Sequence, residues 1–104
     1  MRTLTTTIDG ASRTFGPLLA KTVRLFADDI RRATLGEMTD VGQLLDLAVG
    51  VATASLQRVN PAITEEDVLG WIDMGNYTSY YAGAMGQLMP EATPGEPLAG
   101  NQSG

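Results

Sequence analysis

The stretch that decides the fold of this chain reads Asn60-Pro61-Ala62-Ile63-Thr64-Glu65-Glu66-Asp67-Val68-Leu69-Gly70-Trp71-Ile72. Thr64 followed three residues later by Asp67 is the pattern of a capping box, in which each side chain accepts a hydrogen bond from the other residue's amide. Glu65 and Glu66 suit the positive end of the helix dipole. A helix is therefore predicted to begin at Thr64, over residues 64–74.

Pro61 separates this helix from a longer apolar one. Proline lacks an amide donor and disfavours helix in the residue before it, so the preceding helix is predicted to end by Val59. Thr39 or Asp40 can cap its start. Apolar residues recur along it at helical spacing, with Leu44, Val49 and Val51 widening a stripe of Val41, Leu45, Ala48, Ala52, Leu56 and Val59. Residues 40–59 are predicted to form the central core helix.

The N-terminal part of the chain predicts a small β-hairpin over residues 3–15. Residues 3–8 are rich in β-branched side chains, Asp9-Gly10 is a strong turn dipeptide, and residues 13–15 can return as a second strand. A helix is predicted over residues 17–35, with Pro17 at its first position and Leu35-Gly36 as its stop. Its apolar stripe consists of Leu19, Val23, Phe26, Ile30 and Ala33.

The last predicted helix covers residues 77–89, after the break Asp73-Met74-Gly75-Asn76, with Asn76 as its expected cap. From Pro90 the chain is rich in proline and glycine, and residues 90–104 are predicted to be a flexible tail. The fold class is mainly α (α+β). A small N-terminal hairpin is expected to pack on a bundle of about four helices in one globular domain, residues 1–89.

Composition excludes most familiar active sites. The 104 residues include no cysteine and no histidine, which removes thiolate nucleophiles, imidazole bases and the usual zinc ligands. The net charge is −5, and every Lys and Arg lies at or before Arg58, so the acidic C-terminal half is unsuited to nucleic acid. The start of the chain lacks the apolar core of a signal peptide, and no stretch is long enough for a membrane span. A cytoplasmic protein is predicted.

Two acidic groupings are explained without a metal. Asp28 and Asp29 are consecutive, so on a helix they point about 100° apart. The capping role accounts for Thr64-Glu65-Glu66-Asp67. We therefore predict no catalytic residue, no cofactor and no metal site, and no enzymatic activity.

Aromatic and methionine side chains mark a candidate contact surface. Tyrosine and methionine are common at protein interfaces, and three tyrosines spread around more of a helix than one buried stripe needs. The alternative is that half of these side chains belong to the core. The predicted partner-binding residues are Trp71, Tyr77, Tyr80, Tyr81, Met85 and Met89.

The order of these features resembles the tail assembly chaperones of long-tailed bacteriophages. The resemblance covers roughly residues 3–89. It consists of the hairpin with its Asp9-Gly10 turn, the helix opening near Pro17, the apolar helix, and then Pro61-Ala62-Ile63-Thr64-Glu65-Glu66-Asp67-Val68-Leu69 and Asp73-Met74-Gly75-Asn76.

The resemblance implies a protein of the host bacterial cytoplasm that binds the tape-measure protein, keeps it soluble, helps recruit tail-tube subunits and is absent from the virion. It carries over no catalytic residues. Such chaperones often have a longer form made by translational frameshifting, and residues 90–104 are where such an extension would diverge. A small structural head–tail connector or tail-terminator protein, or a small helical regulatory protein, is the alternative. The oligomeric state stays open.

Overall fold

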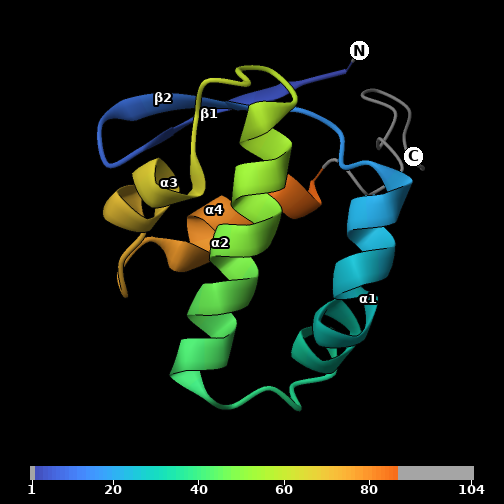
Figure 1. The fold of residues 1–104 in the computed structure, drawn as a ribbon. Coiled ribbons are helices and arrows are strands. Elements are labelled where there is room, and N and C mark those ends of the chain that lie inside the picture. The colour runs from blue at the N-terminus through green and yellow to red at the C-terminus, as the bar shows by residue number, and fades with distance from the viewer. Residues whose placement is uncertain (1, 87–104) are drawn as a thin grey trace, which may run out of the picture.

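A computed structural model of the protein describes residues 2–86, so the predicted tail and Met89 lie outside the described residues. Two antiparallel strands come first, and helices follow (Figure 1). The elements are β1 (Leu4–Ile8), β2 (Ala11–Phe15), α1 (Ala20–Thr34), α2 (Val41–Gln57), α3 (Glu65–Trp71) and α4 (Tyr77–Met85). The predicted fold class, a hairpin packed on four helices, is confirmed.

The hairpin closes through a two-residue turn. Asp9 and Gly10 both adopt positive φ angles, 53° and 79°, as hairpin turns that match the strand twist require. Ile8 then pairs with Ala11, and Leu4 pairs with Phe15. Ile8 and Phe15 are buried, whereas Thr5 and Thr14 share a hydroxyl hydrogen bond of 2.9 Å on the exposed face. One face of the hairpin therefore joins the core.

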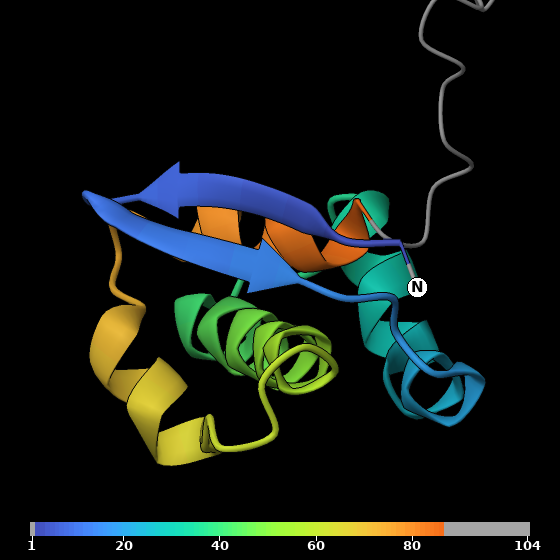
Figure 2. The same cartoon turned by 90° about the horizontal axis from the view of Figure 1, so that it is seen from above.

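Helix α2 is the centre of the molecule. The hairpin covers α2 and α4, while α1 and α3 flank α2 on opposite sides (Figures 1 and 2). Eight residues of α2 are buried, namely Leu47, Ala48, Val49, Val51, Ala52, Thr53, Ser55 and Leu56. Gly50 lets α1 approach closely, because a Cβ atom there would lie 2.5 Å from the Phe26 ring. The predicted role of this helix as the central core element is confirmed.

Three predicted helix ends are confirmed in atomic detail. Thr64 and Asp67 form the complete capping box, with bonds of 3.0 and 3.1 Å. Of the two candidate caps for α2, Asp40 is the one used, and its carboxylate accepts from the amides of Gly42 and Gln43. Gly36, with φ 76°, ends α1 as expected.

The prediction that Pro17 opens α1 is wrong, since the helix begins at Ala20. The segment before it is tied to α2 instead. The Gly16 amide donates to the Ser55 carbonyl at 2.9 Å, the Ser55 hydroxyl donates to the Gly16 carbonyl at 2.7 Å, and Arg58 donates to the Pro17 carbonyl. These contacts keep the backbone extended past the end of α2 before α1 can start.

The other three helices are also shorter than predicted. Helix α2 covers Val41–Gln57 rather than residues 40–59. Helix α3 ends at Trp71, three residues early, because Ile72 is extended (φ −88°, ψ 134°) and packs against the core. Helix α4 ends at Met85 with Gly86 as its C-cap, and residues 87–89 of the predicted helix lie outside the described part.

Asn76 precedes α4 as predicted, but its side chain does not cap that helix. The buried amide links distant segments. Its oxygen accepts from the Asp73 amide at 2.7 Å, and its nitrogen donates to the Asp9 carboxylate at 2.6 Å and the Trp71 carbonyl at 2.8 Å. A buried side-chain amide needs hydrogen-bond partners for its donors and its acceptor, and Asn76 finds them in these three groups. Its bond to Asp9 attaches the hairpin turn to the connection between α3 and α4.

Candidate functional site

The predicted contact residues do not form one exposed surface. Tyr77, Tyr81 and Met85 on α4 and Trp71 at the end of α3 are all half-buried, and Met89 lies outside the described residues. Tyr77 and Tyr81 are four residues apart on α4 and so lie on the same side of the helix. Burial raises the pKa of the Tyr81 hydroxyl, because the charged phenolate loses solvation there.

Tyr80 is a core residue, so its prediction as a partner contact is wrong. Its side chain is 1% exposed, and its ring meets the Phe15 ring edge to face with centroids 6.2 Å apart. Its hydroxyl accepts a hydrogen bond of 3.0 Å from Arg13 Nε. A tyrosine is tolerated in the core when its hydroxyl finds such a partner.

Arg13 is the residue that the sequence reasoning missed. It lies on β2 between Ala11 and Phe15, on the strand face that points toward the helices. Its guanidinium carbon lies 3.7 Å from the centre of the Trp71 ring, a cation–π distance. The period-two alternation of the strand could have placed Arg13 on the inward face, but its aromatic partners come from segments far along the chain.

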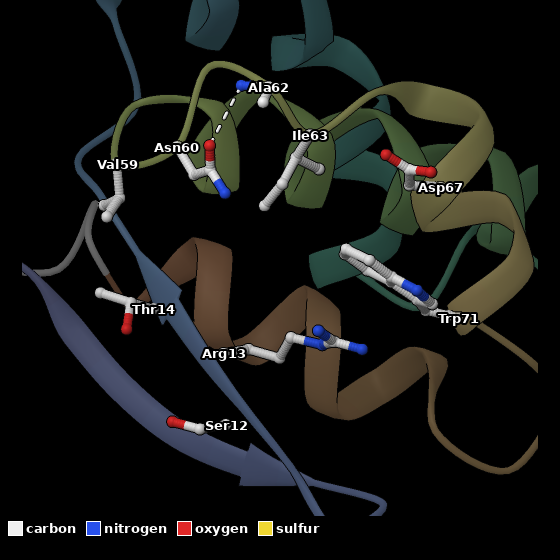
Figure 3. A pocket seen from close by; sticks show the side chains of 9 residues that line it. All are labelled: Ser12, Arg13, Thr14, Val59, Asn60, Ala62, Ile63, Asp67 and Trp71. Carbon is white, nitrogen blue, oxygen red and sulfur yellow. Dashed lines mark hydrogen bonds between the residues drawn. The ribbon is translucent and has the colours of Figure 1, made fainter.

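Arg13 and Trp71 lie in an open groove of about 540 Å³ (Figure 3). One wall is β2, and the other is the connection from α2 to α3 with α3 itself. The lining residues are Ser12, Arg13, Thr14, Val59, Asn60, Ala62, Ile63, Asp67 and Trp71. The volume is within the range of about 300–1,000 Å³ that is typical of ligand sites.

The groove carries both charge and apolar surface. Val59, Ile63 and the Trp71 ring supply apolar atoms. Asp67 stands on the α3 wall, where one carboxylate oxygen already accepts from the Thr64 amide. Among the described residues, no carboxylate forms an ion pair with Arg13, whose contacts are with Tyr80 and Trp71.

The groove combines apolar side chains with two charged residues, Arg13 and Asp67. Within residues 2–86, no three acidic side chains gather closely enough to hold a metal ion. In the same part of the chain, every helix is too short or too polar to span a lipid bilayer. Comparisons of this chain with protein-family models, with curated proteins and with solved structures gave no match.

Proposed function

We propose that this protein is a tail assembly chaperone of a long-tailed bacteriophage. It binds the tape-measure protein in the cytoplasm of the host bacterium, keeps it soluble, and helps recruit tail-tube subunits. The proposal includes no catalytic step, cofactor or metal ion.

The observation that carries the proposal is the succession of elements along the chain. A hairpin with an Asp9-Gly10 turn, a first helix, an apolar helix, a capped helix at Thr64 and the break at residues 73–76 follow in the order that this family resemblance implies. The capped start and the break are its most specific parts, because both place a helix end at a defined residue.

The surface of the protein is compatible with a helical client. Leu25, Leu69 and Met74 are more than half exposed, and Tyr77 and Tyr81 add aromatic area on α4. Apolar side chains of this kind can cover the apolar stripe of a client helix. The net charge of −5 opposes self-association of the chaperone.

The test is co-expression with the tape-measure protein encoded near the gene for this chain. Soluble client that co-purifies with the protein, and precipitates without it, is the expected result. Client that stays insoluble beside a folded, unbound protein would contradict the proposal. Recovery of the chain in purified virions by mass spectrometry would also contradict it, and would favour a head–tail connector or tail terminator.

A paired set of variants tests the residues. Replacing Tyr77 and Tyr81 with alanine, with Tyr80 left intact to preserve the core, is expected to lower co-purified client about tenfold. Replacing the exposed α4 residues Thr78 and Ser79 with alanine is the matched control and should leave binding unchanged. Circular dichroism must first show that both double variants remain folded at the assay temperature. Equal client recovery by the two folded variants would remove the tyrosines from the binding surface.

A further inference from the structure

The outer edge of β2 offers backbone groups to a partner. In a hairpin with a two-residue turn, the pair next to the turn exchanges both backbone bonds, and the following pairs alternate between bonded and unbonded. Ile8 and Ala11 are that first pair, so Ser12 and Thr14 belong to the unbonded pairs. Their amide and carbonyl groups point away from β1.

Gly16 shows where this edge faces. It continues the same alternation, and its amide and carbonyl bond to Ser55 of α2 rather than to β1. The equivalent groups of Ser12 and Thr14 make no hydrogen bond outside the hairpin to any described residue. Both residues line the groove that contains Arg13 (Figure 3).

From these contacts we infer that the groove binds an extended peptide segment of a partner protein that carries an acidic side chain. The segment pairs with the free edge of β2 through Ser12 and Thr14, as an added strand does on an exposed sheet edge. Its carboxylate lies on the guanidinium of Arg13, and its apolar side chains contact Val59 and Ile63. This site stands whether or not the partner is the tape-measure protein.

Charge complementarity selects the acidic class of peptide. Arg13 is held in place by the Trp71 ring and the Tyr80 hydroxyl, yet no described carboxylate pairs with it. A planar guanidinium binds a carboxylate through two parallel hydrogen bonds, so a fixed and unpaired arginine is ready for that ligand. The Asp67 carboxylate on the opposite wall repels an acid, which leaves the Arg13 side as the place for the incoming group.

The other edge of the hairpin lacks these features. A smaller cavity of about 360 Å³ lies between β1 and α4, and its lining contains no charged residue. The residues around it are Leu4, Thr5, Thr6, Thr7, Ile8, Ser79, Ala82 and Gly83. The β1 edge therefore serves as an internal control for peptide pairing at the β2 edge.

The probe is a pool of acetylated and amidated hexapeptides with Glu at the third position and Val or Thr elsewhere. A matched pool carries Gln in place of Glu. Binding is followed on the wild-type protein by the NMR resonances of the backbone amides and of the Trp71 indole N–H. We expect shifts at Ser12, Thr14 and the Trp71 indole, and about tenfold tighter binding of the Glu pool. No shift in the groove, or equal affinity for the two pools, would overturn the inference.

Two proline variants locate the strand pairing. Ser12→Pro removes an amide that faces the groove, and Thr7→Pro removes the matching amide on the opposite edge; neither amide bonds within the hairpin. Ser12→Pro is expected to abolish binding and Thr7→Pro to leave it unchanged. The reverse pattern, or equal loss in both, would contradict pairing at β2.

Arg13→Gln is expected to erase the preference for the Glu pool, and Arg13→Lys to keep part of it, because lysine retains the charge without the planar contact. An unchanged preference in folded Arg13→Gln would place the carboxylate elsewhere. Should that variant fail to fold, the comparison of Glu and Gln pools on wild-type protein remains decisive.

Discussion

Helices α1 and α2 are similar in length, 15 and 17 residues, but they occupy opposite environments. Eight residues of α2 are buried, whereas none of the α1 residues is. The hairpin and the other three helices all contact α2, while α1 packs chiefly on α2 (Figures 1 and 2). The difference shows that position in the bundle, rather than helix length, decides which helix carries the core.

The side chains of the two helices suit these two positions, α2 at the centre of the bundle and α1 at its side. Small residues of α2 such as Ala48, Gly50 and Ala52 let neighbours approach from several sides. Helix α1 turns Phe26 and Ile30 toward the core and keeps charge on its outer face, where Arg31 pairs with Asp28 at 2.8 Å. An amphipathic helix of this kind covers the core without belonging to its centre.

The largest expected contrast comes from truncating one leucine in each helix. Leu56→Ala in α2 should lower the free energy of unfolding by about 2–5 kcal/mol, because the side chain is 1% exposed and its loss leaves a cavity. Leu25→Ala in α1 should change it by less than about 0.5 kcal/mol, since that side chain is 77% exposed. Urea denaturation measures both. Similar losses in the two variants would break the comparison.

A second contrast uses two hydroxyls with almost the same hydrogen bond. The Ser55 hydroxyl donates to the Gly16 carbonyl at 2.7 Å in the core, and the Thr34 hydroxyl donates to the Ile30 carbonyl at 2.8 Å in solvent. Ser55→Ala should cost about 1–3 kcal/mol, because a buried carbonyl loses a partner. Thr34→Ala should cost less than about 0.5 kcal/mol, because water replaces the bond. Equal costs by urea denaturation would mean that burial is not the deciding factor.

Alanine substitutions at two glycines test whether a side chain of α1 moves away from an added methyl group more easily than a side chain of the hairpin does. A Cβ at Gly83 would lie 2.6 Å from the fully buried Phe15 ring, so Gly83→Ala should cost about 1–2 kcal/mol. At Gly50 the clash is with the half-buried Phe26 ring of α1, which can turn aside. The gain in helix propensity, up to about 1 kcal/mol, then offsets the strain in Gly50→Ala. A larger loss in Gly50→Ala, measured by thermal unfolding, would show that α1 is held rigidly.

The smallest effect is expected on the outer face of α1. A hydrogen bond from Arg31, supported by the charges of Arg31 and Arg32, holds the pKa of the Asp28 carboxyl below its usual value of 3.8. A lowered pKa stabilises the fold above the unfolded-state pKa, and that contribution disappears as pH falls through the folded-state value. The exposed carboxylate is screened by water and salt, so the contribution is small.

Thermal unfolding of Asp28→Asn and of the wild type at low ionic strength tests whether the Asp28 carboxylate stabilises the fold at neutral pH and loses that effect in acid. At pH 7 the wild type should unfold at a slightly higher temperature than the variant. This difference in unfolding temperature should vanish toward pH 2. A difference that persists or grows on acidification would contradict the assignment to Asp28.

The features predicted correctly from the sequence close their hydrogen bonds within a few residues. The capping box joins Thr64 to Asp67, Asp40 caps the next residues of α2, and Asp9-Gly10 completes a turn by itself. Side-chain type and spacing are sufficient for such motifs, because their geometry is set by the local backbone.

The errors concern contacts between distant segments. Pro17 does not start α1 because Arg58 binds its carbonyl, and Asn76 does not cap α4 because its side chain bonds to Asp9 and Trp71. The candidate site shows the same division between features set by the local sequence and contacts between distant segments. The sequence makes Trp71 a candidate contact residue by its type alone, whereas Arg13 becomes a candidate only when the folded chain brings it onto the Trp71 ring.

The sequence by itself determined the hairpin, the four helices and three helix ends, at Gly36, Asp40 and Thr64, because propensity, hydrophobic periodicity and capping act within one or two turns of chain. Only the tertiary structure decided that Tyr80 is buried, that Asn76 links the hairpin turn to α4, and that Arg13 lies over Trp71 in an open groove. The partners in those contacts are as many as 67 residues apart. Burial and long-range pairing depend on how the elements pack, which no local pattern contains.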